Sequence, residues 1–166
     1  MLPLTAPPRL QTVIVILDVA GRQVGLPIGI VQDVVKVQRS GPGGAWRVHR
    51  AAVAAICPRG MLAVGDRCVP LVELSDQLGM APTPFARRLR SVVVVQSGEH
   101  VVGLLVDGVA DIVEAPCSAI QPAAPAAGQH PAVRQIARFD DREIELLDFE
   151  RLVGEQSVPS NVRQLR

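Results

Sequence analysis

The sequence predicts an all-β protein made of two similar small barrels, each with five short strands, that share a core. Three observations favour this fold. Aromatic residues make up only 2% of the chain and tyrosine is absent, so the core must consist of aliphatic and β-branched residues, which prefer strands. The apolar runs have the length of strands and are separated by turns rich in glycine and proline. The two halves of the chain also resemble each other.

An internal repeat is the most informative feature of the chain. The tripeptide 24–26 (Val-Gly-Leu) recurs at 102–104, an offset of 102 − 24 = 78 residues. A second block recurs at 148 − 73 = 75 residues, where Glu73 matches Asp148. Further matches are Val31 with Val109, Asp33 with Asp111, Arg67 with Arg142, and Leu71 with Leu146. Because these matches keep their order along the chain, they predict two similar lobes.

Each half predicts the same order of elements. An apolar strand is joined by a glycine-containing turn to a second strand, and a third strand follows. A long loop rich in proline, glycine and alanine then leads to a second hairpin and a short helix that ends near a glycine. In the first half these are the strands 13–17, 22–28 and 31–37, the loop 40–58, the hairpin 61–72 and the helix 73–78. In the second half they are 92–95, 100–106, 109–114, 116–131, 135–147 and 148–153.

The same elements set the expected domain limits. One domain spans residues 12–153, with a first-half lobe at about 12–80 and a second-half lobe at about 91–153. The segments 1–11 and 154–166 are expected to be flexible termini.

Composition argues against several classes of partner. The formal net charge is +1 and there is no basic stripe with stacking aromatics, so we expect no nucleic-acid binding. Arg87, Arg88 and Arg90 form a small basic cluster that is interpreted as a solvated loop. No apolar run is long enough for a membrane-spanning helix, and the N-terminus does not read as a signal peptide. These features predict a soluble cytosolic protein without direct membrane insertion.

No catalytic or metal-binding pattern is visible in the sequence. The three cysteines, Cys57, Cys68 and Cys117, have spacings that fit neither a zinc site nor a disulfide framework, and Cys68 is expected to be a small core residue. No phosphate-binding loop, nucleophile elbow or zinc-protease motif occurs. The chain is therefore predicted to be no enzyme and to need no cofactor or metal. Gly25 and Gly103 interrupt strand patterns, as glycine does at a bend or a close backbone approach.

Over about residues 12–153 the chain resembles the CheW-like domain family. The segment 100–109 (HVVGLLVDGV) resembles the family pattern vGllVDgV, and 31–34 (VQDV) resembles VqEV. The segment 69–74 (VPLVEL) is similar to vPvvDL, and 145–152 (ELLDFERL) is similar to vlLLDlekl. The resemblance implies two SH3-like barrels and a scaffold that links the cytoplasmic tip of a chemoreceptor to the regulatory domain of a CheA-type histidine kinase, which has the same fold. It also implies recruitment to receptor arrays at the inner membrane.

The resemblance implies two sets of binding residues. A groove for the receptor tip would involve Val106, Asp107 and Val109, although Asp107 also suits a simple turn. The kinase contact would involve Val31, Asp33, Gly65, Asp66 and Arg67, although Asp33 also suits a solvent-facing strand position. The glycines at 25, 60 and 103 match family glycines with a structural role; the second of these is Gly60.

The first lobe departs from the family in its second hairpin. The family pattern G-v-x-N-L-R-G aligns with residues 60–66, where Ala63 replaces the Asn, Gly65 replaces the Arg and Asp66 replaces the last Gly. The change removes a cation and adds an acid, so it predicts an altered partner contact and an adaptor for a specialised pathway, such as one for pili, surface sensing or a second messenger. The alternative function is a stand-alone ligand-binding double barrel, which predicts an enclosed pocket with convergent polar groups.

Overall fold

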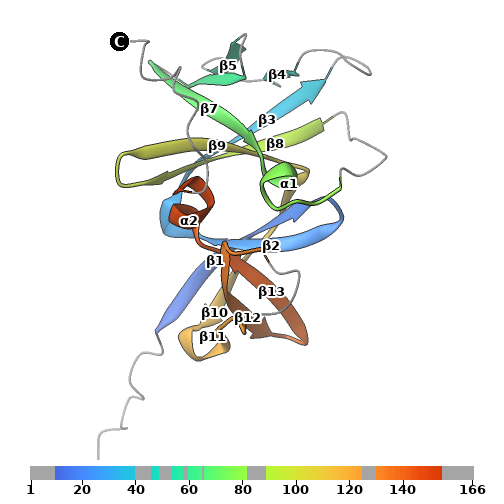
Figure 1. Cartoon of the computed structure of the whole chain (residues 1–166), viewed down its shortest axis with the longest axis vertical. Coiled ribbons are helices and arrows are strands. Elements are labelled where there is room, and N and C mark those ends of the chain that lie inside the picture. Colours follow the sequence, from blue (N-terminus) through green and yellow to red (C-terminus); the bar gives the residue numbers. More distant parts are fainter. Residues whose placement is uncertain are drawn as a thin grey trace, which may run out of the picture.

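The computed structural model describes residues 10–39, 46–48, 54–57, 60–64, 66–81, 89–124 and 130–154. Figure 1 shows two curled sheets that follow each other along the long axis, with the short helices α1 (Leu74–Gln77) and α2 (Phe149–Gly154) near the level where the sheets meet. The predicted all-β, two-lobed fold is thereby confirmed. Within the described residues, neither helix is long and apolar enough to cross a bilayer.

The first sheet has six strands in the order β10-β1-β2-β13-β12-β11. Its strands are β1 (Gln11–Val19), β2 (Arg22–Pro27), β10 (Gly108–Pro116), β11 (Ile120–Pro122), β12 (Val133–Phe139) and β13 (Arg142–Leu147). The 3₁₀ turn η1 (Ile28–Ile30) follows β2, and η2 (Cys117–Ala119) follows β10.

The second sheet has seven strands in the order β4-β3-β8-β9-β7-β6-β5. Its strands are β3 (Val31–Arg39), β4 (Trp46–Val48), β5 (Ala54–Cys57), β6 (Met61–Val64), β7 (Arg67–Glu73), β8 (Leu89–Ser97) and β9 (His100–Val106). The strands β4, β5 and β11 were not predicted, because they lie inside segments that read as long loops.

The two sheets do not correspond to the two halves of the chain. The hairpin β1-β2 joins the later strands β10–β13, and the hairpin β8-β9 joins the earlier strands β3–β7. At the second hairpin the physical reason is the short link that follows it. Only Asp107 separates β9 from β10, and a chain needs about two residues to fold back as a tight hairpin. The third strand therefore continues into the other sheet.

The predicted repeat is visible in the strand pairing. β2 pairs in parallel with β13, where Gly25 faces Leu146, and β9 pairs in parallel with β7, where Gly103 faces Leu71. Both glycines lie at a close approach. A Cβ at Gly25 would come within 2.7 Å of Leu146 Cδ2, and one at Gly103 would come within 2.8 Å of Val92 Cγ1. The two sheets thus share one arrangement of strands. In each of them the central hairpin comes from the other half of the chain.

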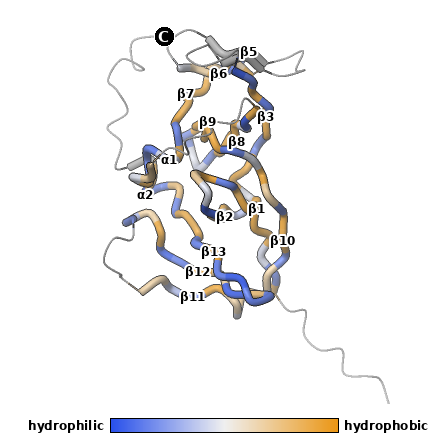
Figure 2. Tube along the Cα trace, turned by 90° about the vertical axis from the view of Figure 1, so that its right-hand side faces the viewer, coloured by the Kyte–Doolittle hydropathy of each residue, from blue (hydrophilic) through white to orange (hydrophobic). Residues whose placement is uncertain are grey.

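One apolar core joins the sheets. The largest cluster of buried side chains combines residues of β1 and β2, such as Leu17 and Leu26, with residues of β8 and β9, such as Val93 and Leu104. Phe149 of α2 packs into the same cluster. Figure 2 shows β8 and β9 as mostly hydrophobic strands near the middle of the molecule. Each sheet also encloses a smaller buried cluster of its own, one that includes Leu62 and Val92 and one that includes Ile14 and Ile144.

Candidate functional site

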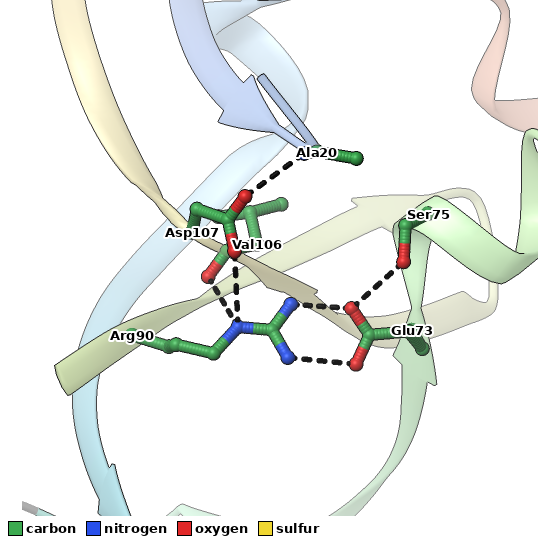
Figure 3. Close-up of polar contacts among 6 residues, drawn as sticks. All are labelled: Ala20, Glu73, Ser75, Arg90, Val106 and Asp107. Carbon is green, nitrogen blue, oxygen red and sulfur yellow. Dashed lines mark hydrogen bonds and ion pairs between the residues drawn. The ribbon is translucent and has the colours of Figure 1, made fainter. Parts of the chain in front are cut away.

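An ion cluster, formed by Arg90, Glu73 and Asp107, lies where the sheets meet (Figure 3). The guanidinium of Arg90 donates two parallel hydrogen bonds to the carboxylate of Glu73, and the bond from Nη1 is 2.8 Å long. Its Nε donates to the Val106 carbonyl at 3.3 Å and lies 3.5 Å from Asp107 Oδ1. The Arg90 side chain is only 11% exposed, so this is a largely desolvated ion pair with fork geometry.

Asp107 connects the cluster to the first sheet. Its Oδ2 accepts a hydrogen bond of 2.8 Å from the amide of Ala20, in the turn between β1 and β2. Its own amide donates to the Asp18 carbonyl at 2.9 Å. Asp107 is thus held by the β1-β2 turn on one side and by Arg90 on the other. These contacts fix the course of the chain at Asp107, where β9 ends and β10 begins.

The other two residues of the expected receptor groove do not form an open wall. Val106 is 0% exposed and belongs to the main core. Val109 is partly buried and packs against the same core. The structure therefore brings Val106, Asp107 and Val109 together at the sheet junction, with the Val106 side chain beyond the reach of a partner.

A groove lies elsewhere, on the first sheet. Two hollows of about 520 Å³ and 360 Å³ share the lining residues Pro27, Gln135, Leu146 and Leu147, and together they form what we call the β13 groove. One end is lined by Asp148, Phe149 and Glu150 at the start of α2. The other end is lined by Thr12 and Cys117. Its lining combines apolar side chains with polar ones in similar measure, and its acidic groups lie at the α2 end.

Two exposed strand surfaces repeat each other, one in each sheet. In β3 the pairing with β8 skips one residue between Val31 and Asp33, and in β10 the pairing with β1 skips one residue just before Asp111. At each bulge the aspartate accepts a hydrogen bond from the next amide, that of Val34 at 2.7 Å and that of Ile112 at 2.8 Å. These are the bulges that re-aim side chains at sheet edges.

The residues after the bulges are exposed apolar side chains. Val34 is 39% exposed and Ile112 is 57% exposed, and their offset is again 112 − 34 = 78. β10 is the outer strand of its sheet, and β4 pairs only with the far end of β3, Val37–Arg39. The pairs Asp33–Val34 and Asp111–Ile112, which we call the twin edges, are therefore similar surfaces on two different sheets.

Comparison with known proteins assigns the family. A sequence model of the CheW-like domain matches residues 14–157. The chain belongs to the CheW-like domain family. It is 34% identical over 99 residues to a probable chemotaxis protein CheW of Rhizobium etli, a match that covers 58% of this chain and 63% of that relative's length. Its fold is similar to the crystal structure of the scaffolding protein TtCheW from Thermoanaerobacter tengcongensis, with a TM-score of 0.68 and 22% identity over 86% of this chain and 92% of that one.

The hairpin in which this CheW-like chain departs from the family pattern lies at the far end of the seven-stranded sheet. Asp66 and Arg67 are exposed, and Gly65 lies outside the described residues. Gly60, before β6, has a φ of +68°, a conformation that glycine adopts without strain. Cys68 is exposed rather than a core residue, because successive side chains of a strand point to opposite faces and its neighbour Val69 takes the buried one.

The structure brings together only part of the expected kinase contact. Val31 and Asp33 lie together at the start of β3, and Val31 is partly buried against the main core. Asp66 and Arg67 belong to the turn between β6 and β7. In the part of the chain that is described, no group of three His, Cys, Asp or Glu side chains could hold a metal ion.

Sequence reasoning missed Arg90 and Glu73. Arg90 was interpreted as part of a solvated loop, whereas it lies in β8 and is largely buried; Arg87 and Arg88 fall outside the described residues. One signal could have found it. Arg90 lies two and four residues before Val92 and Val94, which are buried, so strand alternation places its side chain on a buried face. A buried arginine requires a carboxylate partner.

Proposed function

We propose that this chain is a non-catalytic adaptor that couples the cytoplasmic tip of a chemoreceptor to a CheA-type histidine kinase. Membership of the CheW-like family supports the adaptor role, and the twin edges are the observation on which the proposal mainly rests. An adaptor needs separate surfaces for separate partners. Two similar surfaces on different sheets also suit a head-to-tail assembly, in which one contact type repeats with a partner of the same fold.

The twin edges suit a protein partner. Each presents an exposed apolar side chain beside a carboxylate on a strand that has a free edge over this stretch in the described part of the sheet. The apolar side chain supplies contact area, and the carboxylate orients a partner that offers a cation. We propose that the kinase regulatory domain binds at Asp33 and Val34. Asp33 was expected from the sequence, whereas Val34 was not.

The receptor tip is assigned to the β13 groove. The groove offers apolar side chains for contact with a helix and several polar groups that can orient it. This assignment replaces Val106 as a groove residue, since Val106 is buried.

A charge on one twin edge should separate kinase binding from stability. Val34→Asp should weaken binding to the cognate kinase regulatory domain at least tenfold, since it places a charge in an apolar contact, while the melting temperature stays within about 2 °C of wild type. Leu89→Asp is the matched control, because Leu89 is also exposed, at 44%, but lies outside the twin edges. Isothermal titration calorimetry and thermal unfolding measure both quantities. If Val34→Asp bound the kinase domain with wild-type affinity, the assignment of the kinase to this edge would be wrong.

The altered hairpin favours a specialised pathway. The exposed Asp66 stands where the family pattern ends in glycine, next to the position at which the family has its arginine. We infer that the contact at this turn is changed in charge, and that the adaptor works in the cytoplasm at an array whose receptor or kinase differs from the usual one, as in pathways for pili, surface sensing or a second messenger.

A further inference from the structure

The β13 groove has an equivalent position in the seven-stranded sheet. The two offsets of the repeat relate Pro27 to Leu105 (105 − 27 = 78) and Leu147 to Val72 (147 − 72 = 75). The strands that hold these residues are paired in the same way, since β2 with β13 and β9 with β7 are both parallel pairs. What fills the equivalent position therefore indicates what the groove can accept.

The ion cluster lies at that equivalent position. Arg90 corresponds to Thr12 (90 − 12 = 78), and Glu73 corresponds to Asp148 (148 − 73 = 75). In the seven-stranded sheet the Arg90 side chain reaches Glu73, at the end of β7 (Figure 3). In the six-stranded sheet threonine is too short to reach across, and the two hollows extend between Thr12 and Asp148 instead. The groove thus follows the path that an arginine takes in the other sheet.

The carboxylate at the end of this path has one loosely bound oxygen. Asp148 Oδ1 accepts hydrogen bonds from the amides of Glu150 and Arg151, at 3.1 Å and 3.3 Å, and so caps α2. Its Oδ2 lies 3.8 Å from Nη1 of Arg134, whose side chain is 55% exposed. An exposed ion pair at this distance is weak, so a better-placed cation can replace it.

We propose that the β13 groove binds an apolar segment of its partner that carries an arginine, and that this arginine takes the place that Arg90 takes in the other sheet. The apolar part of the segment covers the floor at Pro27 and Leu147, and the guanidinium pairs with Asp148. Arginine is favoured over lysine because its planar fork matches a carboxylate, as the pair of Arg90 and Glu73 demonstrates in this fold. The proposal rests on the assignment of the receptor tip to this groove.

A matched pair of small probes tests the charge requirement. N-acetylarginine amide and N-acetylcitrulline amide have nearly the same shape, but only the first is charged. Titrated into the labelled full chain, the arginine probe should shift the amide resonances of Leu147 and Phe149 with an apparent affinity at least tenfold above that of citrulline. Equal shifts from both probes, or no shift from either, would overturn the proposal.

Three variants locate the probe in the groove. Asp148→Asn keeps a residue that caps helices well but removes the charge, so it should weaken arginine binding at least fivefold. Arg134→Gln removes the competing cation and should strengthen it. Thr12→Arg with Gly29→Asp rebuilds the ion cluster, since Gly29 corresponds to Asp107 (107 − 29 = 78) and has no atom within 4 Å of an added Cβ. This double variant should lose probe binding while it keeps a dispersed spectrum.

A receptor fragment separates this proposal from the proposed function. If wild type binds the cognate receptor tip and the Asp148→Asn and Thr12→Arg/Gly29→Asp variants bind it equally well, the arginine site is wrong and the adaptor role stands. If wild type does not bind the tip, the receptor assignment itself fails. Since Asp148→Asn is conservative, it keeps the test decisive even if the double variant does not fold.

Discussion

Replacing Arg90 with methionine should lower the free energy of unfolding by about 3 kcal/mol, the lower end of the range for breaking a buried ion pair. Within the residues that the structure describes, the substitution removes the cation that pairs with both Glu73 and Asp107, and Asp107 is just 16% exposed. Two partly buried carboxylates then lack a counter-charge. For a chain of this size the melting temperature should fall by roughly 6–12 °C.

An exposed pair of the same type provides the control. Arg138 and Glu143 are 2.9 Å apart, and both side chains are more than half exposed. Arg138→Met should therefore change stability by less than about 0.5 kcal/mol. Urea unfolding followed by circular dichroism measures both variants. A small, similar loss in the two would mean that the ion cluster contributes no more than a surface pair and does not hold the sheets together.

Val106→Asp should unfold the protein or lower its melting temperature by more than any other change considered for this chain. Val106 is fully buried in the core that joins the two sheets, so the substitution places an unpaired charge in an apolar environment. Binding to both partners should then be lost together, because the fold itself fails. Val34→Asp introduces the same side chain at a position that is 39% exposed and should leave thermal stability nearly unchanged.

Thermal unfolding distinguishes the buried from the exposed placement of Val106. If Val106→Asp melts like wild type and loses only receptor binding, the side chain faces a partner, as the family resemblance implied, and the core described for this junction is wrong.

Local pattern was enough to predict the duplication and the strands other than β4, β5 and β11. The limits of β2 and β9 follow from a glycine turn on one side and an apolar run on the other, and the repeat predicted that Gly25 and Gly103 would be equivalent. The exchange of hairpins was not predicted, because alternation along a strand specifies which side chains are buried but not which sheet covers them. The decisive element was the single-residue link at Asp107.

The site was harder to predict than the fold because its residues meet only through pairing between distant strands. Glu73 and Arg90 lie at the ends of β7 and β8, which are separated by β9 in the sheet. The β13 groove combines Thr12 with Asp148 from opposite ends of the chain. Val34 and Ile112 could have been found as repeat mates, but their exposure depends on the bulges beside Asp33 and Asp111. Such bulges leave no clear signal in an apolar strand.

Bridging of two partners is the measurement that tests the adaptor role most directly. The cognate receptor's cytoplasmic fragment is immobilised, and capture of the cognate kinase is measured with and without this chain. We expect that the kinase is retained only when the chain is present, that Val34→Asp releases the kinase while the chain stays on the receptor, and that Thr12→Arg/Gly29→Asp releases both. Kinase retention that is independent of the chain, or a chain that binds neither partner, would contradict it.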